Sequence, residues 1–241
     1  MERLAAKIKS LAGASTADLI GLAPVDQFSE EEFGELGKQF GPIRSVIVLA
    51  QHIVDPMQTM RFYSGEVYGD SPVGASFGDA LLRHTCWRVV ELLREAGYRA
   101  AIPRNLHYGA DGPTHSISYK KAGVLAGLGA FGRSQLLINP DWGPWMYLRT
   151  VVTEAPLPPD APIEFSPCEG CAARCLDACP AGALTAAGID RDRCAVQAGY
   201  KGSGPTVMRL SPHGQINCEE CTRACPVGTA PARFTKGEKP A

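Results

Sequence analysis

Eight of the nine cysteines of this chain lie between residues 168 and 225, at spacings typical of metal ligands. The first run, Cys168 to Pro180, has the pattern C-x2-C-x3-C-x3-C-P. The second, Cys218 to Pro226, has C-x2-C-x3-C-P, and Cys194 stands alone between the two. Runs of this kind that close on Cys-Pro are typical of loops around an iron-sulfur cluster, because proline cannot donate a backbone hydrogen bond and ends the loop. The spacing therefore predicts iron-sulfur chemistry.

Eight thiolates suffice for two 4Fe-4S clusters with four ligands each. In two-cluster ferredoxins the fourth cysteine of a run ligates the other cluster. The same crossing here predicts one cluster on Cys168, Cys171, Cys175 and Cys225, and a second on Cys179, Cys194, Cys218 and Cys221. The first run departs from the ferredoxin pattern, since it has one residue more between Cys171 and Cys175.

Two other uses of the cysteines stay open. A pair of four-cysteine zinc sites needs the same number of thiolates. A disulfide framework is the third possibility, and it belongs to oxidising compartments. The ninth cysteine, Cys86, lies on an apolar helical stripe and is expected to be a buried core residue.

The composition limits the classes of partner. The chain has 241 residues and a formal net charge of -1, with Lys and Arg scattered along it, which argues against a broad surface for nucleic acid or anionic lipid. No apolar run is long enough to span a bilayer, and the first residues do not form a signal peptide. We therefore expect a cytoplasmic protein without membrane contact, where clustered cysteines indicate metal or redox chemistry.

The rest of the chain must build the domain that uses the electrons. The run SVIVLA at 45–50 predicts a strand buried on both faces, and the apolar spacing of 77–96 predicts a long helix. A second helix is expected at 114–125 with Thr114 as its cap. Residues 55–74 lack periodicity and are expected to form a long loop. The proline-rich segment 155–162 marks a domain boundary.

A glycine-rich loop, AGLGAFGRS at 126–134, lies ahead of that boundary. It follows an expected helix and precedes an expected strand at 136–139, which is the reverse of the order in a dinucleotide-binding fingerprint. By itself the loop predicts only a close approach of the backbone to some neighbour.

Together, the AGLG loop, the continuation QLLINPDWGPW, the run CEGCAARCLDACP and the closing CEECTRACP resemble the cobalamin-dependent iron-sulfur reductases. Epoxyqueuosine reductases and reductive dehalogenases are two branches of that superfamily. The resemblance implies an α+β chain. A nitroreductase-like corrinoid domain would cover 1–162, a ferredoxin-like domain with two 4Fe-4S clusters 163–230, and a tail 231–241. It also implies that the corrinoid site is lined by Gly127, Leu128, Gly129, Gly132, Arg133, Ser134, Leu136 and Asn139.

The resemblance also suggests proton donors, which reductive bond cleavage requires. Asp111 precedes Gly112-Pro113 at a place comparable with the acidic residue of epoxyqueuosine reductases, although the spacing differs. Tyr108 and Tyr119 are the candidates for the tyrosine that reductive dehalogenases use. The alternatives are purely structural roles. Asp111 would form a turn, and the two tyrosines would lie at the edge of the core with hydrogen-bonded hydroxyls.

The expected function is a reductase that passes electrons from the two clusters to bound cobalamin for chemistry on a small molecule. An external donor, a flavodoxin, ferredoxin or reductase, would supply the electrons. A tRNA substrate is not expected, because the sequence stops soon after the second cysteine run, where epoxyqueuosine reductases continue into tRNA-gripping helical repeats. The alternatives are an electron-transfer or cobalamin-handling protein without its own substrate, and an iron-sulfur protein that binds flavin instead of cobalamin.

Overall fold

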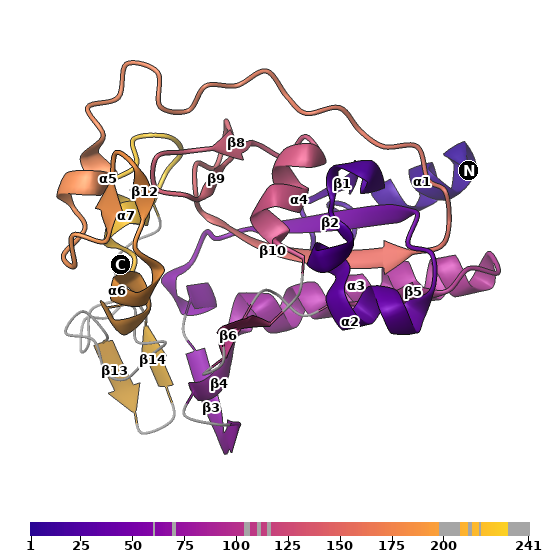
Figure 1. Ribbon diagram of the computed structural model, residues 1–241, viewed down its shortest axis with the longest axis horizontal. Coiled ribbons are helices and arrows are strands. Elements are labelled where there is room, and N and C mark those ends of the chain that lie inside the picture. Colours follow the sequence, from indigo (N-terminus) through magenta and orange to yellow (C-terminus); the bar gives the residue numbers. More distant parts are fainter. Residues whose placement is uncertain are drawn as a thin grey trace. The chain divides into compact units, whose positions relative to one another are not determined.

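The structure is a computed structural model that describes residues 1–59, 61–68, 71–103, 107–109, 112–114, 117–197, 208–211, 214–216 and 218–230. By its internal contacts the chain divides into two units. The first comprises residues 1–52, 81–130 and 146–165, and the second comprises 53–80, 131–145 and 166–241. Each unit is described by itself (Figure 1).

The first unit is built on a four-stranded antiparallel sheet of order β1-β2-β10-β5. The strands are β1 (Leu19–Ala23), β2 (Ser45–His52), β10 (Met146–Thr153) and β5 (Ala100–Ala101). Residues 46–50 of β2 are completely buried, because this strand is paired on both sides and covered on both faces. The strand predicted from SVIVLA is therefore confirmed.

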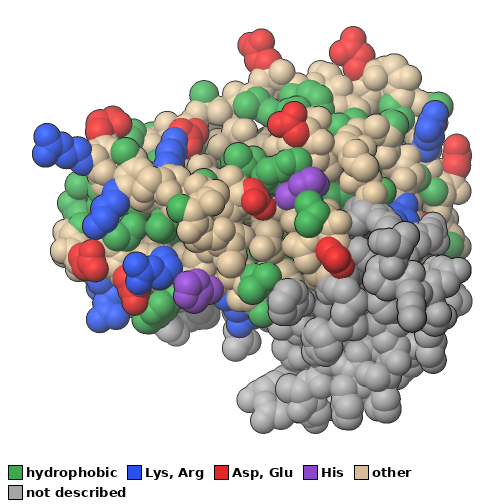
Figure 2. Space-filling view, turned by 180° about the vertical axis from the view of Figure 1, so that it is seen from behind, with side chains coloured by type: hydrophobic (Ala, Val, Ile, Leu, Met, Phe, Trp, Pro, Cys, Tyr) green, Lys and Arg blue, Asp and Glu red, His purple; other side chains and the backbone are tan. Residues whose placement is uncertain are grey.

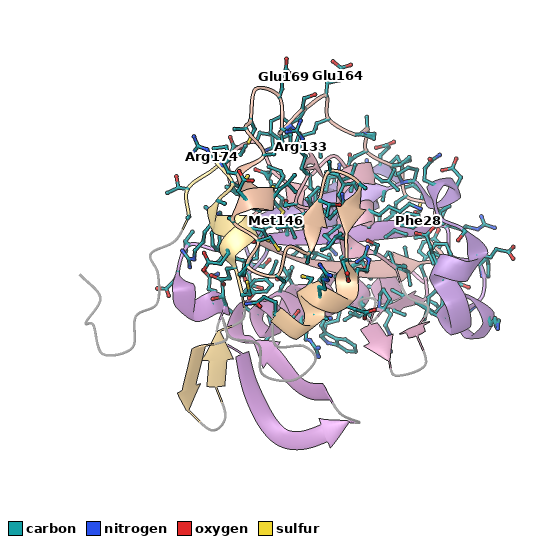
Figure 3. The ribbon with its side chains drawn as sticks, turned by 60° about the vertical axis from the view of Figure 1, so that its left-hand side comes forward. Phe28, Arg133, Met146, Glu164, Glu169 and Arg174 are labelled. Carbon is teal, nitrogen blue, oxygen red and sulfur yellow. The ribbon has the colours of Figure 1, made fainter. Side chains whose placement is uncertain are left out.

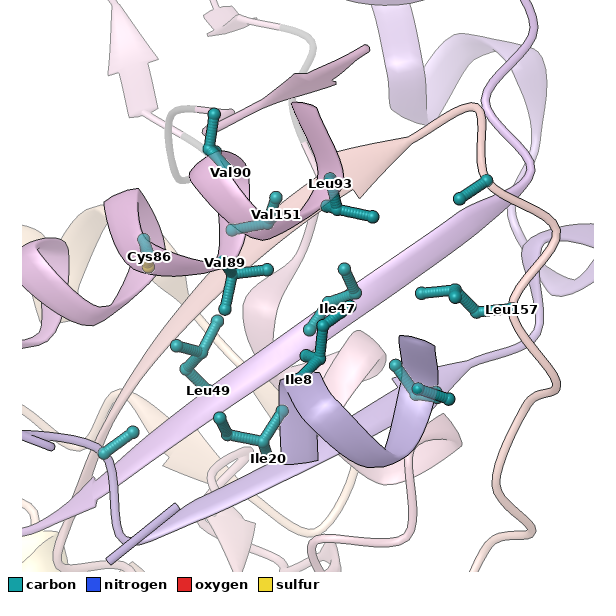
Figure 4. Close-up of a cluster of buried hydrophobic side chains, with 14 of the residues drawn as sticks. Ile8, Ile20, Ile47, Leu49, Cys86, Val89, Val90, Leu93, Val151 and Leu157 are labelled. Carbon is teal, nitrogen blue, oxygen red and sulfur yellow. The ribbon is translucent and has the colours of Figure 1, made fainter. Parts of the chain in front are cut away.

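Helices cover the two faces of this sheet. Side chains of α1 (Glu2–Lys9) and α3 (Phe77–Glu95) pack on the face that carries Ile47, Leu49 and Val151, and form the main core (Figure 4). The helix α4 (Tyr119–Leu125) lies on the opposite face, where Gly21 leaves room for Ala126, just past the end of α4. Cys86 is fully buried in the main core, as its apolar stripe predicts.

Side-chain caps fix where two helices begin. In α2 (Glu30–Phe40) the hydroxyl of Ser29 accepts from the Glu32 amide while the Glu32 carboxylate accepts from the Ser29 amide, a capping box. The α4 helix begins after Ser118, whose Oγ accepts from the Lys121 amide. The cap predicted at Thr114 is wrong, because that residue lies in strand β7 (Gly112–Thr114), which pairs with β6 (His107–Gly109).

The long loop predicted for 55–74 is also wrong. After a short 3-10 turn, η2 (Pro56–Thr59), the chain forms the hairpin β3 (Arg61–Tyr68) and β4 (Ser71–Ser76). This hairpin joins a sheet of order β13-β14-β3-β4 in the second unit, with β13 (Met208–Ser211) and β14 (Gly214–Ile216). A second 3-10 turn, η1 (Val25–Gln27), lies in the first unit.

The rest of the second unit consists of short elements. Strand β9 (Leu137–Ile138) pairs with β8 (Ala130–Phe131), at which the chain passes between the units, and β11 (Leu184–Thr185) pairs with β12 (Gly188–Ile189). The helices are α5 (Arg174–Asp177), α6 (Arg191–Gln197) and α7 (Glu220–Arg223). With so little regular structure, this unit depends on close backbone packing. At Gly143 an added Cβ would lie 1.8 Å from the Val227 carbonyl oxygen.

The domain ranges inferred from the sequence stay a prediction. The last segment of the first unit ends at residue 165, three residues beyond the predicted boundary, while the second unit also takes in 53–80 and 131–145. None of the described helices combines the length and the apolar character that crossing a bilayer requires.

Candidate metal centre

Four thiols of the second unit form a first group. Burial raises the pKa of the Cys175 thiol, and the nearby thiols of Cys168, Cys171 and Cys225 raise it further. The pKa of Cys225 is raised in the same way, first by burial and then by Cys168 and Cys171. These four side chains therefore lie close enough for the charge on one to oppose the charge on another.

The other four thiols form a second group around Cys221. Burial raises the pKa of Cys221 to about 11, and the nearby thiols of Cys194, Cys218 and Cys179 add to the effect. The raised pKa keeps an unliganded Cys221 thiol protonated near neutral pH, whereas a metal cluster, when bound, would hold its sulfur as a thiolate. The structure thus brings the eight cysteines into the two sets that the spacing predicts, and their role as ligands stays a prediction.

Two short helices produce the crossing between the groups. Cys175 lies in α5 and belongs to the first group, while Cys179, four residues later, belongs to the second. Cys221 lies in α7 and belongs to the second group, while Cys225 belongs to the first. The two helices contact one another. Each carries a cysteine of one group and is followed by a cysteine of the other group.

A small cavity opens at the first group. It is lined by the four thiols of that group together with the loop that carries Gly132, Arg133 and Ile138, and with Pro226. The main-chain N–H of Arg133 donates to Cys168 Sγ at 3.3 Å. In the second group, the N–H of Ala183 donates to Cys179 Sγ at 3.3 Å. Such amide donors stabilise sulfur that carries negative charge.

The glycine-rich loop owes its composition to packing in each unit. Gly127 has φ +72°, and an added Cβ would lie 2.5 Å from the Ala161 carbonyl oxygen in the proline-rich segment. At Gly132 an added Cβ would lie 2.9 Å from Ile138 Cγ1. The neighbour that the loop approaches closely is therefore the chain itself.

The other residues predicted to line a corrinoid site are mostly enclosed. Leu128, Gly129, Ser134 and Asn139 are buried, and the Leu136 carbonyl accepts from the Gly132 amide at 3.0 Å. Asn139 closes a turn, since its Oδ1 accepts from the amides of residues 141 and 142 at 2.9 and 3.1 Å. A corrinoid-binding role for these residues stays a prediction.

The structure describes only one of the three predicted catalytic side chains. Asp111 lies outside the described residues, as does the side chain of Tyr108, whose backbone is in β6. Tyr119 is buried at the start of α4, and its hydroxyl donates to the Pro103 carbonyl at 2.5 Å. Arg149 Nη1 in turn donates to the Tyr119 hydroxyl at 3.5 Å. Tyr119 thus fixes the backbone at Pro103, and a catalytic role for any of the three stays a prediction.

Two arginines were not anticipated from the sequence. Arg149, on β10, is only 8% exposed, and the only signal for it is one cation inside the run MYLRTVVT. Arg223 lies on α7 between Cys221 and Cys225, pairs with Glu219 at 2.8 Å and stacks over the buried Trp145 ring at 5.0 Å. The Glu219–Arg223 pair has the i,i+4 spacing of a local ion pair, whereas Trp145 and Tyr119 are distant in sequence from the arginines that they contact, so spacing does not reveal those contacts.

The sequence is similar to those of epoxyqueuosine reductases over about half of its length. No protein-family model matches the chain. Epoxyqueuosine reductase of Bacillus cereus is 36% identical over 116 residues, which cover 47% of this chain and 30% of that protein. The enzyme of Vibrio cholerae is 34% identical over 105 residues, 42% of this chain and 28% of that protein. The matches thus span about a third of the length of these relatives.

Solved structures show a wider likeness. A crystal structure of epoxyqueuosine reductase with an epoxyqueuosine-modified tRNA stem loop matches 94% of this chain and 65% of that chain, with a TM-score of 0.66 and 22% identity. A reductive dehalogenase, whose structure is described in terms of B12-dependent dehalogenation, matches 93% of this chain and 32% of that chain, with a TM-score of 0.57 and 20% identity. The predicted resemblance and the mixed helix and sheet fold are confirmed.

The expectation of a small-molecule substrate is contradicted by these findings, as is the exclusion of tRNA. The named relatives are epoxyqueuosine reductases, and one of the similar structures holds a tRNA stem loop. Net charge argues only against a broad basic surface, because RNA loops can be recognised by stacking and base-edge contacts at one site, which need no net positive charge. On the face in Figure 2, acidic and basic side chains are interspersed.

Proposed function

We propose that this chain, a relative of the cobalamin-dependent iron-sulfur reductases, holds two 4Fe-4S clusters and reduces an epoxide-bearing nucleoside in a tRNA stem loop. The observation that carries the proposal is the crossed arrangement of the cysteines, in which both runs contribute to both groups. In two-cluster ferredoxins the same crossing holds the two clusters near each other, so that electrons can pass between them.

The donor chemistry of each group fits a 4Fe-4S cluster. Each has four cysteine sulfurs, and each has an amide donor on one sulfur, at Cys168 and at Cys179. Among the described residues, no three Cys, His, Asp or Glu side chains are arranged to hold a single metal ion. A zinc ion needs its sulfurs about 2.3 Å away on all sides, and the described residues show no such arrangement.

The corrinoid is the second cofactor that we propose. When bound, cobalamin supplies a low-valent cobalt centre able to take part in reductive bond cleavage. We assign its nitroreductase-like domain to the first unit and the ferredoxin-like cluster domain to the second.

The proposed reaction consumes two electrons and two protons for each epoxide. The two C–O bonds of the epoxide break, an alkene forms, and the oxygen leaves as water. When bound, the clusters would supply these electrons one at a time, with an external one-electron donor of the flavodoxin or ferredoxin class as their source. Asp111 and Tyr108 are the residues of this chain that we assign to proton delivery, and Tyr119 fixes the Pro103 end of the segment that carries them.

Metal analysis of anaerobically purified protein tests the cluster part. We expect about eight irons and eight acid-labile sulfides per chain, as two 4Fe-4S clusters require. Cys225→Ala should lose about half of the iron, whereas Cys86→Ala, at a core position of the first unit, should keep all of it. About two zinc ions per chain without iron would overturn the proposal.

An activity assay tests the substrate part. The reconstituted protein is incubated with cobalamin, a chemical one-electron reductant and an RNA stem loop that carries epoxyqueuosine, and the nucleosides are analysed by mass spectrometry. The expected product has lost one oxygen atom. A matched stem loop with unmodified guanosine is the control. Full cluster and cobalamin loading with no product from the epoxide would refute the proposed substrate and leave the cluster assignment standing.

A further inference from the structure

Arg133 contacts the first cysteine group through both its backbone and its side chain. Its main-chain N–H donates to Cys168 Sγ at 3.3 Å, and its Nη1 donates to the Cys171 carbonyl oxygen at 3.2 Å. One residue of the glycine-rich loop therefore holds a proposed ligand and the turn that carries the next one. Figure 3 shows Arg133 with Glu169 and Arg174 of the cysteine loop.

The turn that presents Arg133 is tightly built. The Gly132 amide donates to the Leu136 carbonyl at 3.0 Å, and the Gln135 amide donates to the Gly132 carbonyl at 2.9 Å. Gly132 is buried against Ile138, where any larger residue would clash, and Gln135 takes a φ of +59°. The amide of Arg133 is thus aimed at the sulfur by a turn with little room to adjust.

Arg133 also lies in the wall of the cavity at the first cysteine group. Arg133 is among the residues that line the cavity, together with all four thiols of the first group. Its side chain is exposed, so the guanidinium brings a positive charge to the rim from the solvent side without being buried itself. A cluster in this cavity would gain a negative charge on reduction beside a fixed cation and an N–H donor.

We propose that Arg133 is a positioning residue that braces the Cys168–Cys171 turn and raises the reduction potential of the cluster on Cys168, Cys171, Cys175 and Cys225. The inference rests on the proposed function for the presence of that cluster. Hydrogen bonds to the sulfurs and nearby charge set cluster potentials, because both favour the more negative, reduced form. Arg133 thereby makes this cluster easier to reduce than it would be without the guanidinium.

Three variants of the holoprotein separate charge from bracing. Arg133→Gln removes the charge but keeps an N–H donor at the end of the side chain, whereas Arg133→Lys keeps the charge. Arg174→Gln is the matched control, because Arg174 is an exposed cation directly before Cys175 but does not line the cavity. The main-chain amide at residue 133 is present in all of them.

Redox titration monitored by electron paramagnetic resonance gives the readout. At the potential where this cluster is half reduced in the wild type, Arg133→Gln should have about a tenfold lower ratio of reduced to oxidised cluster, equivalent to 59 mV for one electron. Arg133→Lys and Arg174→Gln should stay within about threefold of the wild type, and the second cluster should not change. Full retention of the first cluster in Arg133→Gln together with the lowered midpoint would show that the charge acts on the potential separately from the bracing.

Two results would overturn the inference. An unchanged midpoint in Arg133→Gln, with full iron content, would show that the guanidinium does not act on the cluster. An equal shift in Arg174→Gln would show a general surface-charge effect. Failure of the proposed cluster assignment is a different outcome, since the wild type itself would then lack iron and give no signal in any titration.

Discussion

Gly143→Ala should lower the stability of the second unit far more than the same substitution at Gly170, a glycine with a similar backbone conformation. Gly143 has φ +62°, and its added Cβ would lie 1.8 Å from the Val227 carbonyl oxygen and 2.7 Å from the carbonyl carbon. At Gly228, in the facing segment, an added Cβ would lie 2.2 Å from the Trp142 carbonyl carbon. The neighbours are backbone on both sides, so the substitution must move the segment directly after Cys225 and Pro226.

Gly170→Ala is the control, because it isolates the backbone contribution. Gly170 has φ +67° and no atom within 4 Å of an added Cβ, and it lies in the same unit. Both variants lose about 1–2 kcal/mol by forcing alanine into the left-handed region. The overlap at Gly143 adds to this, so the total there should exceed about 4 kcal/mol, within the range that indicates a severe local disruption.

Heating the holoprotein while following cluster absorbance measures the difference. At about 2–4 °C per kcal/mol for a chain of this size, Gly170→Ala should lower the apparent midpoint by about 2–8 °C. Gly143→Ala should lower it by more than about 8 °C and should lose the iron of the first group during purification. A Gly143→Ala protein with full iron content and the same midpoint as Gly170→Ala would refute the argument.

Three further predictions concern the ligands, one ion pair and one cap. Cys175→Ala and Cys179→Ala, four residues apart, should abolish different clusters in paramagnetic resonance spectra, and loss of the same cluster from both would contradict the crossing. Burial raises the pKa of Glu32, but hydrogen bonds from Lys121 and from its helix cap outweigh it and hold the pKa below its usual 4.5. Its contribution to stability is therefore present above about pH 4.5 and lost as pH falls through the lowered pKa, so Glu32→Gln should flatten the acid limb of unfolding curves. Ser118→Ala should cost about 1 kcal/mol through loss of the α4 cap, measured as a small drop in the unfolding midpoint.

Sequence reasoning succeeded where a local pattern settles the structure. The apolar run of β2 is stable only where both faces of a strand are buried, and it forms a strand in the interior of the sheet. The partition of the thiols into two sets could also be predicted, because the ferredoxin rule turns sequence spacing into a spatial crossing. In both cases the residues that carry the signal are the residues that make the contact.

Sequence reasoning failed where a segment is held by residues that lie far away in the sequence. The hairpin at 61–76 has Gly, Pro and Ser in place of clear alternation, and the residues of β14 that pair with β3 lie about 150 residues later in the chain. Gly127 is needed for the Ala161 carbonyl, a contact that no local pattern encodes. The substrate depends on the surface as a whole, and net charge does not describe it.

The additional residue in the first cysteine run has a structural explanation. Ala173 takes φ +56° and ψ +35°, and it is the residue from which α5 begins. A left-handed residue reverses the local direction of the chain, so one added position is absorbed by the turn, and Cys175 still lies among Cys168, Cys171 and Cys225. Alanine is strained in this conformation by about 1–2 kcal/mol, which the surrounding turn must offset. The departure from ferredoxin spacing is therefore compatible with four sulfurs in one group, and it starts the helix that carries Cys179 to the other group.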